Sequence, residues 1–517
     1  MAQRAGALEQ EAEARYRAVD YPGAIDRYEE AFRAYREAGD RLGAGRAARI
    51  VAWLHGNVHG DWAVAGGWFG RARALLEDAG PDSAEHGWVL LMQVAPDGDP
   101  TVQEARCRQA LELGRRHGDP DLEFEAQGWV ALTLIQSGRV EEGLLLFDEV
   151  LAALCAGEIR DVFVVEGTIC GMFLACERAN DVVRAEQWLR VTEDVVGRPY
   201  MAGVSAFCRA HYGGILTAAG RWSEAEVELT EAARLLDRTY VGMRGTALVR
   251  LADLRARQGR LEEAEELLAG FDQRPDAFRP LAAVHFARGN TALARDLLER
   301  ALAQDDMVAV AGPVLALLVD VELADGAVAD ARRAAQSLAD LAVRQGGHYL
   351  RAAAALARGK VCVAEGTSDA RACLREALSS FAEARMPVHL AQARLELARA
   401  LAAERPEVAL AEASAALEAF ERLQAARDAD AAAAVVRSLG GPARTGPKRR
   451  QPLTRREEEV LDLLGHGLTN PEIGERLYIS RKTVEHHVGR VLAKLGLRSR
   501  AEAAAHAART GRRPGRE

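Results

Sequence analysis

The chain has 517 residues, of which 49% are hydrophobic, 28% are charged and only 5% are aromatic, proportions typical of a protein that buries a core. Its longest uncharged apolar run, Met307–Val319, has 13 residues and contains Gly312-Pro313, which excludes it as a membrane-spanning helix. Met1–Gly441 carries 50 basic and 67 acidic residues, whereas Pro442–Glu517 carries 17 basic and 9 acidic ones, so an acidic body precedes a basic end that favours nucleic acid.

The beginning of the chain, Met1–Arg4 followed by Glu-rich sequence, contains no apolar stretch that resembles a signal peptide. The seven cysteines show no Cys-x-x-Cys spacing, and the interval between Cys170 and Cys176 suits neither a zinc clip nor a redox pair. We therefore expect a cytoplasmic protein with reduced cysteines, no metal site and no cofactor. The abundance of Ala and the scarcity of β-branched runs favour helices.

A short pattern recurs along the first 440 residues: a turn-like residue is followed five positions later by a small residue, and then by an apolar helical stretch. Most successive copies start 37 to 42 residues apart. Weaker copies lie near Gly98, Gly366 and Glu404. The eight clear copies are Val19–Ala24, Gly60–Ala65, Gly138–Gly143, Asn180–Ala185, Gly220–Ala225, Gly259–Ala264, Gly289–Ala294 and Gly326–Ala331.

This pattern predicts helical hairpins, in which the Gly or Asn ends one helix and the small residue lets the next helix approach it closely. A hairpin cannot bury its apolar side alone, so about eleven of them should stack into an α-solenoid. The unit resembles the tetratricopeptide repeat, although its period is nearer 40 than 34 and most of that repeat's aromatic positions are missing. An irregular all-helical domain is the alternative.

A solenoid has a concave surface suited to a protein, a peptide or a small ligand, and the sequence does not distinguish these. Five tryptophans are candidates for this surface. Because Trp62 and Trp222 occupy equivalent positions in their repeats, packing within the array is the preferred interpretation for them. The five are Trp53, Trp62, Trp68, Trp188 and Trp222.

Residues 441–451 contain two prolines and four basic residues after the Gly440-Gly441 pair, which predicts a flexible linker between a repeat domain at 1–440 and a second domain at 452–510. Residues 511–517 form a basic tail. Helix start signals such as the capping boxes Thr454-x-x-Glu457, Thr469-x-x-Glu472 and Ser499-x-x-Glu502 predict four short helices in the second domain. These helices are expected near 455–465, 470–477, 481–495 and 500–509.

The third of these helices has two different faces. At about 100° per residue, an apolar stripe should pack on Ile473, Leu477, Val460 and Leu464, while the opposite face stays free to enter a DNA groove. The preceding helix and the turn ending at Ser480 complete a helix-turn-helix. The stripe consists of Val484, Val488, Val491, Leu492 and Leu495.

From Leu453 to Arg509 the sequence resembles the LuxR/FixJ-type helix-turn-helix domain without a gap. The resemblance implies that the third helix lies in the major groove, that the fourth forms a dimer contact, and that the partners are double-stranded DNA, a second copy and RNA polymerase. The matching segments are Leu453-Thr454-x-Arg456-Glu457-x-x-Val460-Leu461, Gly467-Leu468-Thr469-Asn470-x-Glu472-Ile473, Ser480-x-Lys482-Thr483-Val484-x-x-His487-Val488 and Lys494-Leu495-Gly496-Leu497-x-Ser499-Arg500.

The same resemblance divides the third helix into two sets of expected DNA contacts. Glu485, His486 and Gly489 stand where base-reading side chains vary, and a Glu can accept from cytosine N4 while a His can donate to a purine N7. Gly489 offers no side chain for such a contact. His487 has either a packing role or a phosphate contact. The expected phosphate contacts are Lys482, Thr483, Arg490 and Lys494, and Arg481 is a further expected DNA contact.

Three functions remain to be compared. The first is a bacterial transcription regulator, nucleoid-associated when bound to DNA, whose repeats respond to a protein or small-molecule effector. The second is an interaction scaffold with secondary DNA contact. An enzyme is disfavoured, because Gly359-Lys360 lacks the upstream Gly and the following Ser/Thr of a phosphate-binding loop, and neither a receiver domain nor a nucleophile elbow is evident.

Overall fold

The computed structural model describes residues 2–510 except 95–98, 197–200, 238–242, 304–310, 442–454, 478–480, 496 and 498, and some helical side chains are also left undescribed. The chain divides into two compact units, Met1–Gly440 and Gly441–Glu517. Every regular element in these described ranges is a helix, so the expected all-α fold is confirmed. None of these helices is both long and apolar enough to cross a membrane.

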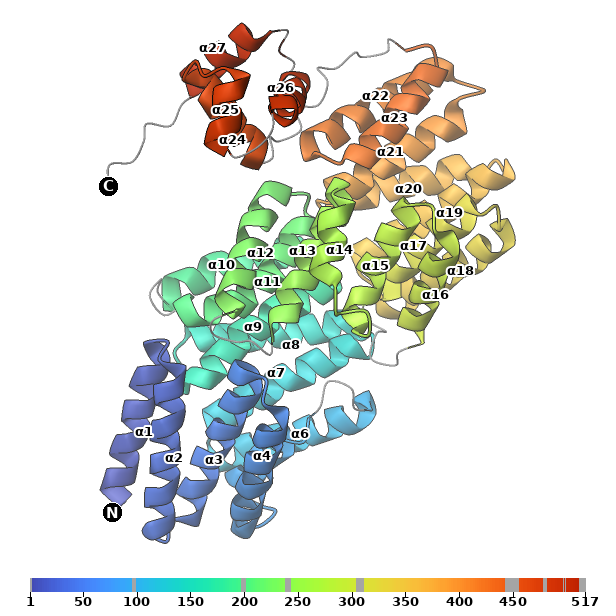
Figure 1. Ribbon diagram of the computed structural model, residues 1–517. Helices are drawn as coiled ribbons and strands as arrows, with labels where there is room; N and C mark the ends of the chain where they lie inside the picture. The colour runs from blue at the N-terminus through green and yellow to red at the C-terminus, as the bar shows by residue number, and fades with distance from the viewer. Residues whose placement is uncertain are drawn as a thin grey trace. The chain divides into compact units, whose positions relative to one another are not determined.

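In the described part of the first unit, the chain forms an array of 23 α-helices, most of them joined by tight turns (Figure 1). In chain order they are α1 (Ala2–Arg17), α2 (Tyr21–Glu37), α3 (Arg41–Leu54), α4 (Trp62–Leu76), α5 (Ala84–Leu91), α6 (Pro100–His117), α7 (Pro120–Gln136), α8 (Val140–Cys155), α9 (Val162–Ala179), α10 (Val182–Val196), α11 (Met201–Ala218), α12 (Trp222–Leu236), α13 (Arg244–Gln258), α14 (Leu261–Leu268), α15 (Pro275–Ala287), α16 (Thr291–Leu302), α17 (Ala311–Ala324), α18 (Val328–Gln345), α19 (His348–Glu365), α20 (Ala370–Glu383), α21 (Pro387–Leu401), α22 (Pro406–Leu423) and α23 (Ala426–Ser438).

The turn residues of the repeat have the backbone conformation that the pattern requires. All eight, including Val19 and Asn180, have φ between 52° and 90°. At Gly259 the backbone N–H donates to the Ala256 carbonyl at 3.0 Å, and the next N–H, that of Arg260, donates to the Arg255 carbonyl at 2.9 Å. These two bonds satisfy carbonyls at the end of α13 and reverse the chain into α14. The predicted hairpin turns are therefore present.

The small residue five positions after each turn residue lies in the helix–helix contact. Each of the seven alanines at this position is at most 1% exposed. The eighth copy has Gly143, where an added Cβ would lie 2.6 Å from the Ala131 carbonyl oxygen and 2.7 Å from Ile135 Cγ1. Helices α7 and α8 thus approach too closely even for alanine, which explains why this copy has Gly where the other seven have Ala.

The hairpins stack in two rows. Successive odd-numbered helices from α5 to α23 pack against one another, and each also packs against its even-numbered neighbour. This arrangement confirms a helical-repeat, tetratricopeptide-like architecture.

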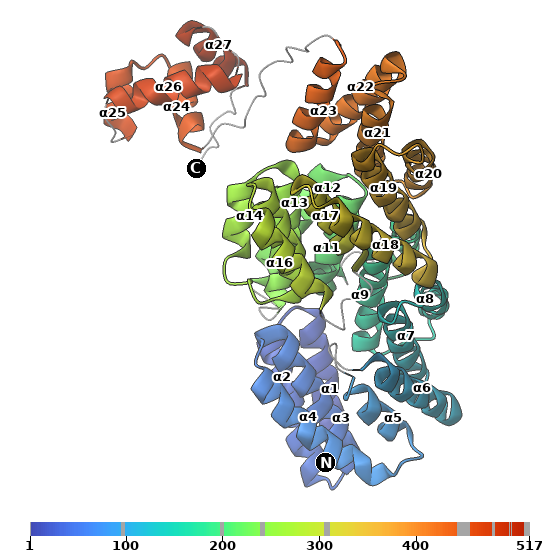
Figure 2. The same ribbon diagram turned by 90° about the vertical axis from the view of Figure 1, so that its right-hand side faces the viewer.

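The second half of the array also packs against the first (Figure 2). One apolar cluster joins residues of α11–α13, such as Leu216 and Leu254, to residues of α21–α23, such as Val388 and Phe420. The α11–α12 turn lies so near α21 that a Cβ on Gly220 would come within 2.7 Å of Pro387 Cγ. The array is therefore closed by contacts between hairpins that are distant in sequence.

The contact with α21–α23 makes a difference between two tryptophans that occupy equivalent positions in their repeats. Trp222 is 4% exposed, lies in the cluster shared with α21–α23, and donates from Nε1 to the Thr217 carbonyl at 3.0 Å. Trp62 is 59% exposed, with one ring edge against Gly56. The prediction that both tryptophans pack within the array is right for Trp222 and wrong for Trp62, because no described helix covers the corresponding position on α4.

The seven cysteines are free thiols. Two of them, Cys170 on α9 and Cys208 on α11, have Sγ atoms only 2.6 Å apart. Burial, together with the neighbouring Cys170, raises the pKa of the Cys208 thiol well above its ordinary value. Sequence spacing gave no indication of this contact, because the two residues are brought together only by the packing of α9 on α11.

Within the described residues, the second unit contains four helices. Their bounds agree with the predicted ones to within one residue at each end. They are α24 (Arg455–Gly465), α25 (Asn470–Leu477), α26 (Arg481–Leu495) and α27 (Arg500–Thr510).

Candidate nucleic-acid interface

The core of the second unit is formed by the apolar face of α26 and the three helices around it. Val484 and Val491 of α26 are fully buried and Val488 is 8% exposed. They pack with Ile473 of α25, while Leu477 and Leu492 are partly buried at the edge of the same cluster. The cluster is completed by Val460 and Leu464 of α24 and by Ala503 of α27. Of the predicted stripe, Val484, Val488 and Val491 are thus buried and Leu492 is partly buried, while the Leu495 side chain lies outside the described residues.

The start of α25 is fixed by a capping interaction. The Thr469 backbone N–H donates to Glu472 Oε2 at 2.6 Å, and the Thr469 hydroxyl donates to the same oxygen at 2.7 Å. These two bonds lower the pKa of Glu472 below its ordinary value. The carboxylate therefore reaches back over the first turn, as a capping box requires, although the hydroxyl donates to it instead of accepting a backbone N–H.

Two contacts hold helix α27 against the other helices of the second unit. Arg500 Nη1 donates to Asn470 Oδ1 at 2.6 Å, and Nη2 donates to the Leu468 carbonyl. At the other contact, a Cβ on Gly465 would lie 2.7 Å from Ala507 Cβ, so α24 and α27 cross closely there. Neither contact was predicted from the sequence. The helix-turn-helix residue Asn470 thus has a structural contact.

The opposite face of α26 is open. Glu485, Gly489 and Arg490 are exposed, and a Cβ built on Gly489 meets no atom within 4 Å. These three expected DNA-contact positions therefore lie together on the side away from the apolar cluster. His487 is partly buried, and its Nδ1 has no hydrogen-bond partner within the part of the chain that the structure describes.

For the other expected DNA-contact residues, the structure describes the backbone and not the side chain. The backbone positions of Arg481, Lys482, Thr483, His486 and Lys494 lie in α26, but their side chains lie outside the described residues. Ser480 and Thr454 are also outside them. The open face is therefore defined by Glu485, Gly489 and Arg490. Among the described residues, no group of three or more His, Cys, Asp or Glu side chains is placed to hold a metal ion.

Comparison with known families agrees with this geometry. Residues 451–507 match the family described as bacterial regulatory proteins, luxR family. The second unit contains a luxR-family helix-turn-helix domain. The expected LuxR-type resemblance is therefore confirmed for this part of the chain.

Curated relatives match over the same short length. The chain is 51% identical over 59 residues to the transcriptional regulatory protein LnrK of Bacillus subtilis, which is 11% of this chain and 27% of LnrK. It is 42% identical over 83 residues, 16% of this chain, to the DNA-binding transcriptional activator DevR/DosR of Mycobacterium tuberculosis, of which it covers 36%. The chain thus spans only about a quarter to a third of the length of these relatives.

Solved structures are similar at low identity. A Rap protein complexed with competence and sporulation factor matches with 13% identity and a TM-score of 0.41 over 62% of this chain and 98% of its own. The Cut9–Hcn1 hetero-tetramer of the APC/C matches with 13% identity and a TM-score of 0.37, covering 83% of this chain and 96% of that chain. The helical-repeat assignment rests on the hairpin contacts described above.

Proposed function

We propose that this protein is a bacterial transcription regulator that binds specific DNA sequences through α26. The observation that carries the proposal is the division of α26 into a buried apolar face and an open face containing Glu485, Gly489 and Arg490. A helix held in this way can enter the major groove without disturbing the packing behind it. The basic charge of the C-terminal segment supports phosphate binding.

In this proposal the residues of α26 fall into two roles. Glu485, His486 and the space at Gly489 face base edges, where Glu485 accepts from a cytosine amino group and His486 donates to a purine N7. The phosphate-binding set holds the helix in register without reading sequence, and His487 supports its position. That set is Arg481, Lys482, Thr483, Arg490 and Lys494.

The assembly and its control belong to the same proposal. Two copies pair through α27 on a two-fold-symmetric site and act with RNA polymerase in the cytoplasm at the nucleoid. The helical array receives a protein or small-molecule signal and controls access to the DNA-reading unit through the linker at 441–451. The protein is a regulator and not an enzyme.

The test is selection of genomic DNA fragments by the full-length protein at near-physiological salt. A Lys482→Ala/His486→Ala variant is the control. We expect one short symmetric motif that the variant no longer selects. Separately, Lys482→Ala should weaken binding to all sequences and flatten its salt dependence, while His486→Ala should change sequence preference. Uniform, salt-sensitive binding by both proteins would refute sequence-specific reading.

A further inference from the structure

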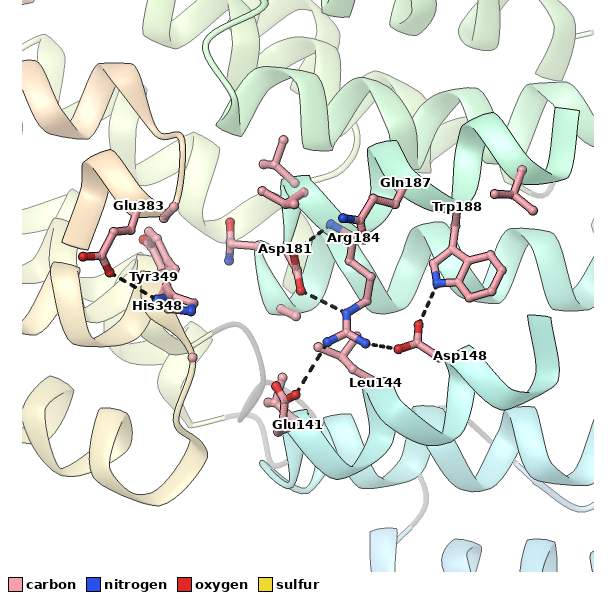
Figure 3. A pocket seen from close by; sticks show the side chains of 18 residues that line it. Glu141, Leu144, Asp148, Asp181, Arg184, Gln187, Trp188, His348, Tyr349 and Glu383 are labelled. Carbon is pink, nitrogen blue, oxygen red and sulfur yellow. Dashed lines mark hydrogen bonds and ion pairs between the residues drawn. The ribbon is translucent and has the colours of Figure 1, made fainter. Parts of the chain in front are cut away.

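A cleft of about 660 Å³ lies within the helical array, between hairpins that are far apart in the sequence (Figure 3). One wall is formed by α8, by the α9–α10 turn and by α10. The other is formed by the start of α19 and the end of α20. Its volume is within the range of sites that enclose small organic molecules.

The cleft contains more negative than positive charge. Glu141, Asp148 and Asp181 lie on the first wall around a single arginine, Arg184, and Glu383 lies on the other wall. Arg184 Nε donates to Asp181 Oδ2 at 3.1 Å, and its Nη1 donates to Asp148. One guanidinium therefore faces three carboxylates on its own wall. Because its single positive charge cannot neutralise all three, the wall remains negative and disfavours an anionic ligand.

The two inner carboxylates already have structural roles. Asp148 Oδ1 accepts from Trp188 Nε1 at 2.6 Å, and Asp181 Oδ1 accepts from the Arg184 backbone N–H at 3.0 Å at the start of α10. Their arrangement fixes the indole of Trp188 and the guanidinium of Arg184 as parts of the wall. These two carboxylates therefore have little capacity for a further strong contact.

The two outer carboxylates differ in this respect. Glu141 is 3.6 Å from Arg184 Nη2 and Glu383 Oε2 is 3.8 Å from His348 Nδ1, both longer than hydrogen bonds. Their side chains are 69% and 62% exposed, so both remain accessible to a guest. They stand on opposite walls, where a molecule with two cationic groups could contact both.

The first wall also carries apolar side chains. Val140 and Leu144 of α8 and Val183 and Val191 of α10 contribute aliphatic surface, and Trp188 contributes an aromatic one. Methylene groups of a guest would lose unfavourable contact with water on this surface. An indole can also stabilise a nearby cation through its ring face.

We propose that this cleft binds a small organic dication, an aliphatic molecule with two protonated amino groups that are held by Glu141 and Glu383 while its methylene groups lie against the apolar side chains of the first wall. Such a ligand links α8–α10 to α19–α20 and so stabilises one curvature of the array. This inference rests on the proposed function in one respect: the bound dication would be the small-molecule signal that the array receives.

The test is isothermal titration calorimetry of the full-length protein at 150 mM salt, about the physiological value. The probes are 1,4-diaminobutane and 1,6-diaminohexane, each compared with the diol of the same chain length, and adipate. We expect saturable binding of at least one diamine at one site per chain, and no binding of the diols or adipate. Absence of saturable diamine binding, or equal binding of the matching diol, would overturn the proposal.

Two double variants locate the site. Glu141→Gln/Glu383→Gln should weaken diamine binding at least tenfold. Glu407→Gln/Glu418→Gln removes the same charge from exposed positions of α22 and should leave the affinity unchanged. Equal weakening by both pairs, or by neither, would show that the diamine binds elsewhere through general charge attraction.

The DNA selection described above is independent of this titration. If the Glu141→Gln/Glu383→Gln protein loses the diamine but still selects the DNA motif, both proposals hold. Diamine binding without motif selection by the unmodified protein would refute the proposed function and leave the cleft assignment intact.

Discussion

Arg500 of α27 donates a hydrogen bond to the side chain of Asn470, the first residue of α25, with a distance of 2.6 Å between Nη1 and Oδ1. A second bond from the same guanidinium reaches the Leu468 carbonyl. One side chain thus ties the last helix of the chain to the beginning of the helix-turn-helix. Because α27 is also the proposed dimer helix, this contact connects the DNA-reading and pairing elements.

Replacing Arg500 with alanine should loosen both helices. Hydrogen bonds to charged groups contribute about 1.5–3 kcal/mol to the free energy of unfolding. Because the Arg500–Asn470 pair is partly exposed, we expect a loss near the lower value. Hydrogen–deuterium exchange of the full-length protein should show amides of α25 and α27 exchanging roughly tenfold faster. Arg476→Ala, at an exposed position of α25, is the control; equal effects of the two changes would contradict a specific role for Arg500.

Gly489 tests the open face of α26. Since a Cβ there meets nothing within 4 Å, Gly489→Ala should fit and stabilise the helix by about 0.5–1 kcal/mol. Gly489→Glu should also fold but should weaken DNA binding at least tenfold, because it adds a negative charge to the face that enters the groove of the negatively charged DNA. The measurements are thermal unfolding and titration of the selected DNA. Gly66→Glu, at a similarly open position of α4, should leave DNA binding unchanged.

Gly143 tests the close approach of α7 and α8. Gly143→Ala would place a methyl group 2.6 Å from the Ala131 carbonyl oxygen, and we expect a loss of about 1–3 kcal/mol in the free energy of unfolding. Gly128→Ala on α7 is the matched control, because its Cβ would meet only Phe147 Cζ at 3.9 Å. Urea unfolding compares the two, and an equal response would refute the packing explanation.

Glu166 of α9 should make the array less stable as the pH rises. Burial raises its pKa to about 7, although the hydrogen bond from the Tyr16 hydroxyl opposes this shift. The folded state therefore holds a proton that the unfolded chain releases near its ordinary pKa of 4.5. The contribution of this proton to the free energy of unfolding is complete below pH 4.5 and is lost as the pH rises through about 7.

Glu166→Gln keeps an acceptor for Tyr16 and removes the titration. The variant should be more stable than the unmodified protein at pH 8, by an amount of order 1–3 kcal/mol, and the difference should shrink towards pH 5. Thermal unfolding at intervals between these pH values measures it. A constant difference across the range would mean that Glu166 does not titrate there.

Glu177 should behave in the opposite way. Burial by itself would raise its pKa, but Arg250 and His211 outweigh burial and lower the pKa to about 2. The Arg250 guanidinium donates to both carboxylate oxygens, at 2.7 and 2.6 Å. This stabilisation is present above the ordinary carboxyl pKa of 4.5 and is lost as the pH falls through about 2.

Glu177→Gln should therefore lower the free energy of unfolding at pH 7 by about 2–4 kcal/mol, since it leaves Arg250 without its charge partner. The loss should diminish as the pH approaches 2. Glu112→Gln breaks the exposed pair with Arg116 and should cost far less, because water screens this pair. Urea unfolding of both variants distinguishes the mostly buried pair from the exposed one.

Much of the fold followed from the sequence because its signals are local. A hairpin turn needs a residue with positive φ and a small residue five positions later, and both requirements act within one repeat, so Gly259 and Ala264 were identifiable without any knowledge of their neighbours. The buried stripe from Val484 to Val491 likewise follows from helical periodicity alone.

What the sequence by itself determined is therefore the all-α fold, the hairpin turns, the four C-terminal helices and the faces of α26. The tertiary structure alone decided that Trp222 is covered while Trp62 is exposed, that Arg500 reaches Asn470, and that Glu141 and Glu383 line one cleft. The physical reason is that these relationships join residues about 30 to 240 positions apart. Such contacts depend on how the hairpins stack, and stacking leaves no periodic signal in the chain.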